Sequence, residues 1–170
     1  ANRLDGMKAR YDKAEVNVNK IASSLEGHQV QLMKDIVMLD KLYETNLAYH
    51  KELSMYILAG KKRLKRERET TLEELKAKAQ RSGLPEDAQA ANDFAQQCDS
   101  FEKKLHDLEL TRMVSVQMSP QIRLVQNNDR LMAEKIQSTI VNTIPLWKSQ
   151  MVLALGVAHS ADAVRAQREV

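Results

Sequence analysis

The sequence has few of the residues that interrupt helices. Among 170 residues there are only 5 glycines and 3 prolines, and aromatic residues make up 4%. Charged residues account for 29% of the chain and hydrophobic residues for 43%. Few helix breakers, few aromatics and many charges are typical of long amphipathic helices rather than of a sheet. The composition therefore predicts an all-α fold.

The sequence also has only one cysteine, no long apolar run and a small net charge. The single cysteine, Cys98, excludes an intramolecular disulfide and favours a reducing compartment. The longest apolar run, 151–158, is far shorter than the ~20 residues that span a bilayer, and no signal peptide is visible. A net charge of +3 demands no polyanionic partner. We expect a cytoplasmic protein, with peripheral contact at the inner face of the membrane as an option.

The first half of the chain predicts one long helix. Apolar residues recur in three- and four-residue steps, which indicates coiled-coil packing, and the phase continues across Gly27, so we expect no hairpin there. Gly27 should weaken the helix by roughly 1 kcal/mol relative to alanine. The Gly and Pro of residues 81–85 are the strongest stop signal, which places a helix over about 3–81 and a turn over 82–85. The expected seam includes Leu4, Met7, Tyr11, Ala14, Val18, Ile21, Leu25, Leu32, Leu39, Leu42, Tyr49, Leu53 and Tyr56, with His28, Asp35 and Asn46 as polar exceptions.

The second half predicts two further helices. One runs from about 86 to 118 with its seam through Phe94, Cys98 and Leu105. Ser119 followed by Pro120 is typical of a helix start, so the next helix should run from about 119 to 170. The expected fold is one domain over 1–170, with three long helices in an elongated antiparallel coiled-coil-like bundle.

This arrangement leaves residues 1–48 without a partner in the chain. Their apolar seam would be covered by missing sequence, by a second copy, or by a break at Gly27. The sequence begins with Ala1 and stops within a helical pattern. We therefore expect a fragment of a longer protein.

A polar block interrupts the last expected helix where an apolar residue should recur. It consists of Gln126, Asn127, Asn128 and Asp129. Through a turn at 118–119, Arg112 would lie within about one helical turn of this block. The set could be a buried polar layer that fixes the register of the helices. It could instead be an anion site with Arg112 as the fork-shaped donor.

Pro145 and Trp147, later in the same expected helix, indicate a local distortion. Pro145 removes a backbone donor and should kink the helix or open a bulge. Trp147 follows two positions later. It is either a core tryptophan packed at the bend, or part of a hinge or partner-docking face.

A basic run occupies residues 61–68 and includes Lys61, Lys62, Arg63, Lys65 and Arg66. The simplest interpretation is a solvated helix surface. The alternative is attraction to anionic lipid, since a basic amphipathic helix can lie on a membrane surface. Binding to nucleic acid is the weaker expectation, because no aromatic residues alternate with the cations.

No pattern in the sequence predicts catalysis. The four histidines and Cys98 are scattered without the spacing of a metal site, and Cys98 falls on a seam, as an inert buried thiol would. Neither a phosphate-binding glycine-rich loop nor a Ser/His/Asp set is present. We expect no metal, no cofactor and no enzymatic activity.

Three stretches, 39–61, 101–129 and 135–156, resemble the toxic anion resistance family, the TelA-type tellurite resistance proteins of bacteria. They read LDKLYETNLAYHKELSMYILAGK, FEKKLHDLELTRMVSVQMSPQIRLVQNND and KIQSTIVNTIPLWKSQMVLALG. Members of this family are longer than this chain. The resemblance implies a soluble, cytoplasmic, helical protein linked to resistance against tellurite and related stresses. It brings no catalytic residue set.

Two functions follow from these expectations. The first is a non-enzymatic scaffold or adaptor in resistance to toxic anions and related envelope or chemical stress. Its partners would be other stress-resistance proteins, and self-association or pairing with missing parts of the chain would complete it. The second is direct binding of a toxic oxyanion at a polar layer around Arg112 and Asp129.

Overall fold

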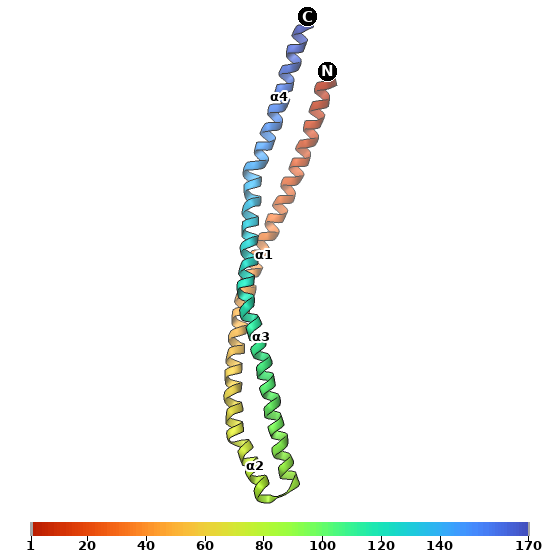
Figure 1. Cartoon of the computed structure of the whole chain (residues 1–170). Coiled ribbons are helices and arrows are strands. Elements are labelled where there is room, and N and C mark those ends of the chain that lie inside the picture. The colour runs from red at the N-terminus through yellow and green to blue at the C-terminus, as the bar shows by residue number, and fades with distance from the viewer. Residues whose placement is uncertain (1, 170) are drawn as a thin grey trace. The chain divides into compact units, whose positions relative to one another are not determined.

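The computed structural model describes residues 2–169 and confirms the all-α prediction, since no strand occurs in this range. The elements are α1 (Asn2–Glu69), α2 (Thr71–Ser82), α3 (Pro85–Ser138), the π-helix η1 (Thr139–Thr143) and α4 (Ile144–Arg168) (Figure 1). Two compact units are built from these elements. Unit 1 contains the described residues of 1–39 and 125–170, and unit 2 contains residues 40–124.

The expected third helix does not begin at Ser119. Helix α3 passes through this point with Pro120 in its interior, so the chain has two long helices where three were expected. A proline in a helix removes one backbone hydrogen bond and crowds the carbonyl of the preceding turn. Pro120 lies on the exposed face of α3, where water can satisfy the freed carbonyl.

The first long helix follows the prediction with one difference. Helix α1 continues through Gly27, as expected, but it ends at Glu69 and α2 begins at Thr71. Between them Thr70 has φ −113° and ψ −77°, and its hydroxyl donates a 2.6 Å hydrogen bond to the carbonyl of Arg66. Such bonding of a threonine back to its own helix competes with the regular backbone ladder and bends it.

The turn after α2 confirms the Gly–Pro signal. Gly83 has φ +61°, and its N–H donates to the carbonyl of Ala79. Glycine adopts this left-handed conformation without the penalty of a Cβ atom. Pro85 begins α3, where its fixed φ suits the first helical position. Figure 1 shows this turn joining α2 to α3.

Unit 2 is an antiparallel pair in which residues 40–69 of α1, together with α2, pack against residues 85–124 of α3. Leu64, Cys98 and Leu105 form its buried cluster, which Phe94 and Phe101 extend. Gly60 is also buried, and the side chain of Leu105 lies against its backbone. Cys98 is therefore the buried thiol that its place on the seam predicted.

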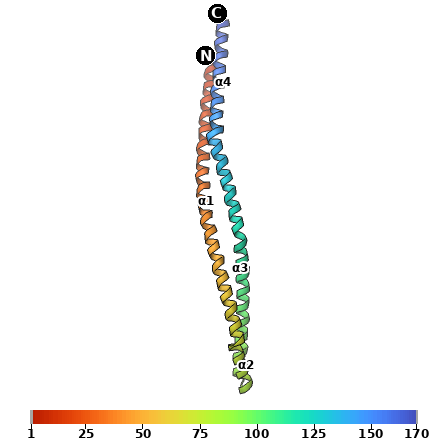
Figure 2. The ribbon, with the colours of Figure 1, turned by 90° about the vertical axis from the view of Figure 1, so that its left-hand side faces the viewer.

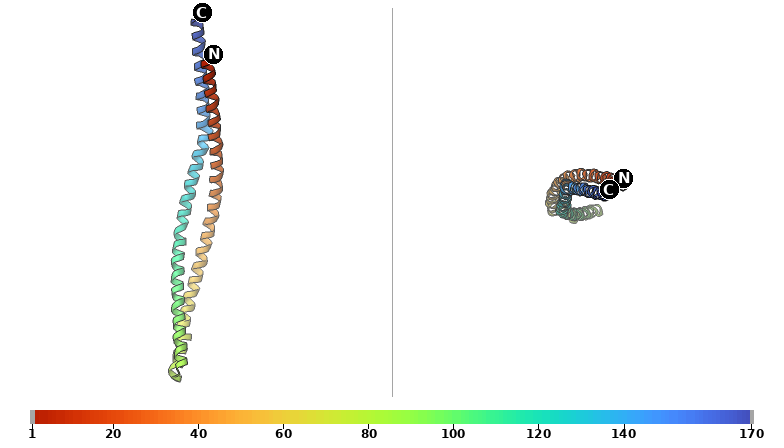
Figure 3. Two further views of the ribbon diagram at one scale, coloured as in Figure 1. Left: turned by 90° about the vertical axis from the view of Figure 1, so that its right-hand side faces the viewer. Right: turned by 90° about the horizontal axis from the view of Figure 1, so that it is seen from above.

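Unit 1 supplies a partner for residues 2–39, which form most of the segment 1–48 that was expected to lack one. Residues 2–39 of α1 share this unit with the end of α3, with η1 and with α4, and the amide of Gln29 donates a 2.7 Å hydrogen bond to that of Gln137. Figures 2 and 3 let the reader follow α4 and the first part of α1. Because α3 does not turn back at Ser119, it continues far enough to cover this first part of α1.

On the part of α1 that belongs to unit 2, every second predicted seam position is correct, since Asn46 and Leu53 are buried. At the positions between them, the residue that faces α3 is the one after the predicted residue. Tyr56 is 59% exposed, whereas its neighbour Ile57 is buried. The predicted Leu42 and Tyr49 are likewise exposed, and the more enclosed positions are Tyr43 and His50.

Candidate functional site

The most enclosed polar cluster of unit 2 joins Asn46 of α1 to Ser115 and Ser119 of α3. The amide nitrogen of Asn46 donates to the carbonyl oxygen of Ser115 at 2.6 Å and to the hydroxyl of Ser119 at 2.9 Å. The hydroxyl of Ser115 donates in return to the amide oxygen of Asn46 at 2.7 Å. Asn46 and Ser115 are both buried. Because these polar groups satisfy one another, the layer favours one register of α1 against α3 over its neighbours.

The sequence predicts Asn46 only as a polar exception in the seam, and it does not predict Ser115 as its partner. An asparagine at a core position of a heptad pattern was the available signal. Ser115 lies opposite Asn46 because α3 runs antiparallel to α1, and this pairing is a property of the fold rather than of either local sequence.

Arg112 lies at the edge of unit 2 rather than in a buried layer. Its Nε donates a 2.6 Å hydrogen bond to the hydroxyl of Ser54, which donates in turn to the carbonyl of His50 at 2.8 Å. Arg112 itself is exposed. The expected turn at 118–119 would have brought it beside Gln126. In the continuous α3 about four helical turns separate the two residues.

The polar block divides between the inside and the outside of unit 1. Gln126 is fully buried, and its amide nitrogen donates to the carbonyl of Ile36 at 3.0 Å. Asp129 is half-buried, whereas Asn127 and Asn128 are exposed. The block therefore places one buried amide in the seam, and the other three side chains are more accessible to solvent.

One edge of the unit 2 seam is formed by ion pairs. Lys61 pairs with Glu109, and Arg68 contacts Glu102 at 2.6 Å and Asp99 at 2.8 Å. The hydrogen bond from Arg68 lowers the pKa of Glu102 below its ordinary value. The bond from Lys61 does the same for Glu109.

A further pair closes the same edge near the end of unit 2. Arg123 contacts Asp40 at 2.6 Å and lies over the ring of Tyr43, 3.8 Å from its centroid. The hydrogen bond to Asp40 raises the pKa of Arg123. Arg123 thereby combines an ion pair with a cation–π contact across α1 and α3.

The basic run of residues 61–68 does not form a purely cationic surface. Lys61 and Lys65 line a groove together with Glu69, Glu102 and Glu109, so acids balance the cations there. The remaining predicted surface cations are exposed. They are Lys62, Arg63 and Arg66. This arrangement is compatible with a solvated helix surface.

Pro145 lies directly after a backbone distortion, as its missing donor predicted. Residues Thr139–Thr143 form η1, and the N–H of Ile144 donates to the carbonyl of Thr139, five residues back. The extra residue in this turn shifts the inward-facing positions of the following helix by one. Ile144 is 3% exposed, whereas Trp147 is 42% exposed. Trp147 is therefore not enclosed in the core of unit 1.

Two features were looked for among the side chains and helices of the described residues: a cluster of metal ligands and a helix that could span a membrane. Across residues 2–169 no group of three or more His, Cys, Asp or Glu side chains is placed to hold a metal ion. Within the same range no helix is long and apolar enough to cross a bilayer. The Nδ1 atom of His50 is buried without a hydrogen-bond partner.

Comparison with known proteins identifies the family. The model of the toxic anion resistance protein (TelA) family matches residues 1–170. A TelA-like protein of Staphylococcus epidermidis is 41% identical over 162 residues, which cover 95% of this chain and 43% of that protein. Uncharacterized proteins of Listeria monocytogenes and Bacillus subtilis are each 40% identical, over 98% and 100% of this chain and over 42% and 44% of their own lengths.

The chain thus spans less than half the length of these curated relatives. No solved structure matches it. The family model covers every residue of the sequence, and the relatives share about two residues in five with it. The chain belongs to the toxic anion resistance (TelA) family.

Proposed function

We propose that this chain is a non-enzymatic helical scaffold or adaptor in bacterial resistance to toxic anions such as tellurite. Its partners would be other stress-resistance proteins, and its place of action the cytoplasm, including the inner face of the membrane. Membership of the TelA family supports the link to toxic anions.

The observation that carries the scaffold role is the amount of surface left uncovered. The chain exposes 12,895 Å² to solvent. A folded monomer of its mass, 19.4 kDa, exposes roughly 8,500 Å². The exposed side chains include apolar ones at helical spacing, which suggests that other helices cover them.

Unit 1 carries one such surface on α1. Val30, Met33 and Val37 follow one another at three- and four-residue steps, and all three are more than half exposed. With Gln29 and Lys34 they line an open groove of about 610 Å³. An apolar stripe of this kind fits the side of a partner helix.

Direct binding of an oxyanion around Arg112 and Asp129 has weaker support. The two side chains were expected at one level, but about four to five turns of α3 lie between them. Arg112 also uses its Nε on Ser54. The polar layer around Asn46 contains no cation among its hydrogen-bonded members.

The test places Val30→Glu and Val37→Glu together in the gene that encodes this chain. Both side chains are exposed, so we expect the helical content to stay unchanged while resistance to tellurite falls several-fold, because partner contacts are lost. Glutamate at Ser24 and Gln31 is the matched control, because both residues are exposed, lie outside the groove and are likewise seven residues apart. Undiminished resistance in the valine variant would contradict the scaffold role.

A second experiment tests the alternative function. The purified chain is titrated calorimetrically with tellurite and with phosphate, beside the variant Arg112→Met. The scaffold role predicts no saturable binding. Saturable binding that disappears in Arg112→Met would instead establish an oxyanion site that depends on Arg112.

A further inference from the structure

The end of α3, η1 and most of α4 carry almost no charge. Residues 136–161 contain a single Asp, Glu, Lys or Arg, which is Lys148, whereas charged residues make up 29% of the whole sequence. A helix with one face in solvent normally carries charged and polar side chains on that face. This segment therefore lacks most of the charges that a solvated helix face carries.

Helix α4 is apolar on two opposite faces. Its inward face in unit 1 includes Ile144, which is 3% exposed, and the half-buried Met151 and Leu155. Two positions after each inward residue, about 200° around the helix, lies an exposed apolar residue. We call these residues the outer face of α4, and they are Leu146, Leu153, Val157 and Val164. Each of the four side chains is at least half exposed.

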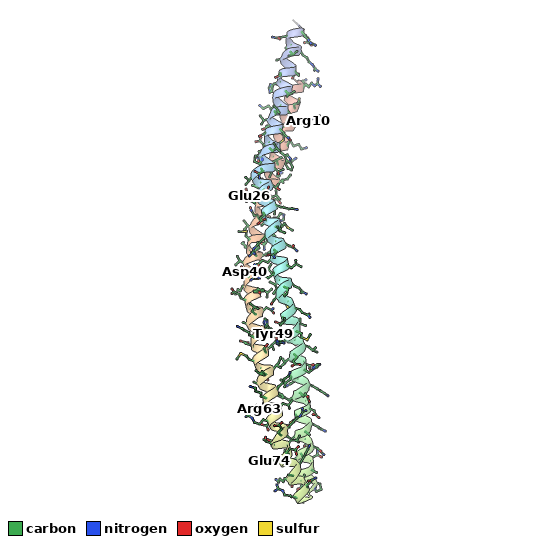
Figure 4. The ribbon with its side chains drawn as sticks, turned by 60° about the vertical axis from the view of Figure 1, so that its left-hand side comes forward. Arg10, Glu26, Asp40, Tyr49, Arg63 and Glu74 are labelled. Atoms are coloured by element: carbon green, nitrogen blue, oxygen red, sulfur yellow. The ribbon has the colours of Figure 1, made fainter. Side chains whose placement is uncertain are left out.

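The first part of α1, which is the partner of α4 in unit 1, shows the usual pattern instead. Its face away from the seam carries Lys13, Lys20 and Gln31, each exposed and each two positions after a half-buried residue. Figure 4 labels Arg10 and Glu26, two further exposed charged residues of this part of α1. The two helices of unit 1 therefore differ, since α1 presents polar side chains at the positions where α4 presents apolar ones.

The outer face of α4 is long enough to receive another helix. It extends about 27 Å along the helix axis from Leu146 to Val164. Its apolar residues follow one another at steps of seven, four and seven residues, which is the spacing of a packed helix seam. The residues that complete this face, Gln150 and Ser160, are polar but uncharged. A helix with apolar residues on opposite faces is typical of one that lies between two other elements.

The relatives show how much protein is available to cover this face. The residues that match this chain make up 43% of the Staphylococcus epidermidis protein and 44% of the Bacillus subtilis protein. In a protein of that length the additional residues join this segment at one end or both, and residues 2 and 169 both belong to unit 1. A segment joined by a short linker acts at an effective concentration of about 1 mM. This concentration favours a segment of the same chain over a second copy.

We propose that a helix from the part of the full-length protein outside these 170 residues packs on the outer face of α4. This helix becomes the third of unit 1, so that α4 lies between it and α1. It presents apolar residues to α4 at the same spacing of seven and four residues. The proposal does not rest on the scaffold role, whose test uses Val30 and Val37 of α1.

The charges disfavour a membrane surface as the occupant. A helix that lies in a bilayer interface carries lysines and arginines on a polar face opposite its apolar face. Between residues 144 and 161 the one such cation of α4 is Lys148, and it is half-buried. The face opposite the outer face is the apolar seam of unit 1, which packs against protein.

The test measures maleimide labelling of single cysteines in the protein as its gene encodes it. Leu153→Cys and Val157→Cys, made separately, should react roughly 10-fold or more slowly than Lys20→Cys, because a covered face must open before the reagent enters. Lys20 is the matched control, since it is exposed on the corresponding face of α1. The labelling of the parent protein is subtracted, and each rate is divided by the rate in denaturant.

The other possible occupants give different results in this experiment. Equal rates at Leu153→Cys and Lys20→Cys would mean that the outer face is open, and would overturn the proposal. A covering helix of the same chain protects equally at all protein concentrations. Protection that is lost on dilution would identify a second copy instead, and protection that requires added vesicles of anionic lipid would identify a membrane. Either result would also overturn the proposal.

A pair of charges provides a second measurement. Leu146→Glu with Leu153→Glu should lower the Tm of the full-length protein by several degrees, because the covering helix would bury both carboxylates. Ser24→Glu with Gln31→Glu is the control, since both residues are exposed on α1 and are likewise seven residues apart. The control pair should leave the Tm almost unchanged. An equal Tm for the two double variants would contradict a covered outer face.

Discussion

Gly60 lies where α3 leaves no room for a larger residue on α1. A Cβ atom at this position would come within 2.6 Å of a methyl group of Leu105 and 3.3 Å of the ring of Phe101. Leu105 is almost fully buried, so it cannot easily move aside. The sequence shows a glycine near the end of α1, but only the packing of α3 shows that a side chain is excluded there.

We expect Gly60→Val to lower the free energy of unfolding of unit 2 by about 1–3 kcal/mol, the usual cost of overpacking a core. Chemical denaturation followed by circular dichroism measures it. Gly27→Val is the matched control, because nothing lies within 4 Å of a Cβ at Gly27. That change should stay within about 0.5 kcal/mol of wild type. Equal effects at the two glycines would show that α1 and α3 do not approach closely at Gly60.

Pro145 determines how the elements α3, η1 and α4 are joined. Core positions at seven-residue spacing include the buried Gln126 and Ala133 and the half-buried Ile140, and an undistorted helix would add Trp147 to this series. The π-helix ahead of Pro145 inserts one extra residue into the turn, so Ile144 faces inward and Trp147 outward. A single turn thus decides which side chains of α4 are inside unit 1.

Replacing Pro145 with alanine removes the reason for the π-helix, since the missing donor is restored. We expect a regular helix, a rotation of Trp147 toward the core and a blue shift of its fluorescence. Pro120→Ala is the control, because Pro120 is exposed in a regular helix and replacing it does not change which side chains face the core. An unshifted Pro145→Ala spectrum would mean that the packing of α4, rather than the proline, holds the distortion in place.

For the whole molecule, the pairing of distant segments is the main finding. Residues 2–39 share a unit with residues 125–169, although a chain that turned at Ser119 would have left them without a partner. Gln29 and Gln137 mark this pairing with a direct side-chain hydrogen bond. The pairing also explains why the apolar seam of residues 1–48 need not be covered entirely by sequence outside this chain.

A cross-linking test checks this pairing. Gln29→Cys with Gln137→Cys should be joined within one chain by a short bismaleimide, because the two amides are 2.7 Å apart and the linker replaces the length that the cysteines lack. Gln31→Cys with Gln137→Cys should react more slowly, since Gln31 contacts Asp35 of its own helix. The native Cys98 is buried and should stay unmodified in both variants. Equal cross-linking of the two pairs would contradict the arrangement of unit 1.

Local sequence by itself determined the helical class, the continuity through Gly27, the turn at Gly83 and Pro85, and the family. These features depend on short-range properties such as apolar periodicity, the left-handed freedom of glycine and the fixed φ of proline. In the sequence, Gln126 is only a polar residue that interrupts the apolar seam. Nothing in the sequence predicts that its amide donates to the carbonyl of Ile36.

Only the tertiary structure decided that the helix continues through Ser119 and Pro120, which side of α1 faces α3, and that Trp147 is exposed. A Ser–Pro pair favours a helix start, and a proline inside a helix costs about 3 kcal/mol, yet α3 stays continuous through it because of its long-range pairing with α1. Tyr56 and Ile57 are both apolar, so periodicity alone could not rank them, whereas the close approach of Leu105 at Gly60 placed Ile57 inside. Burial is a property of two surfaces together, and a single helix sequence contains only one of them.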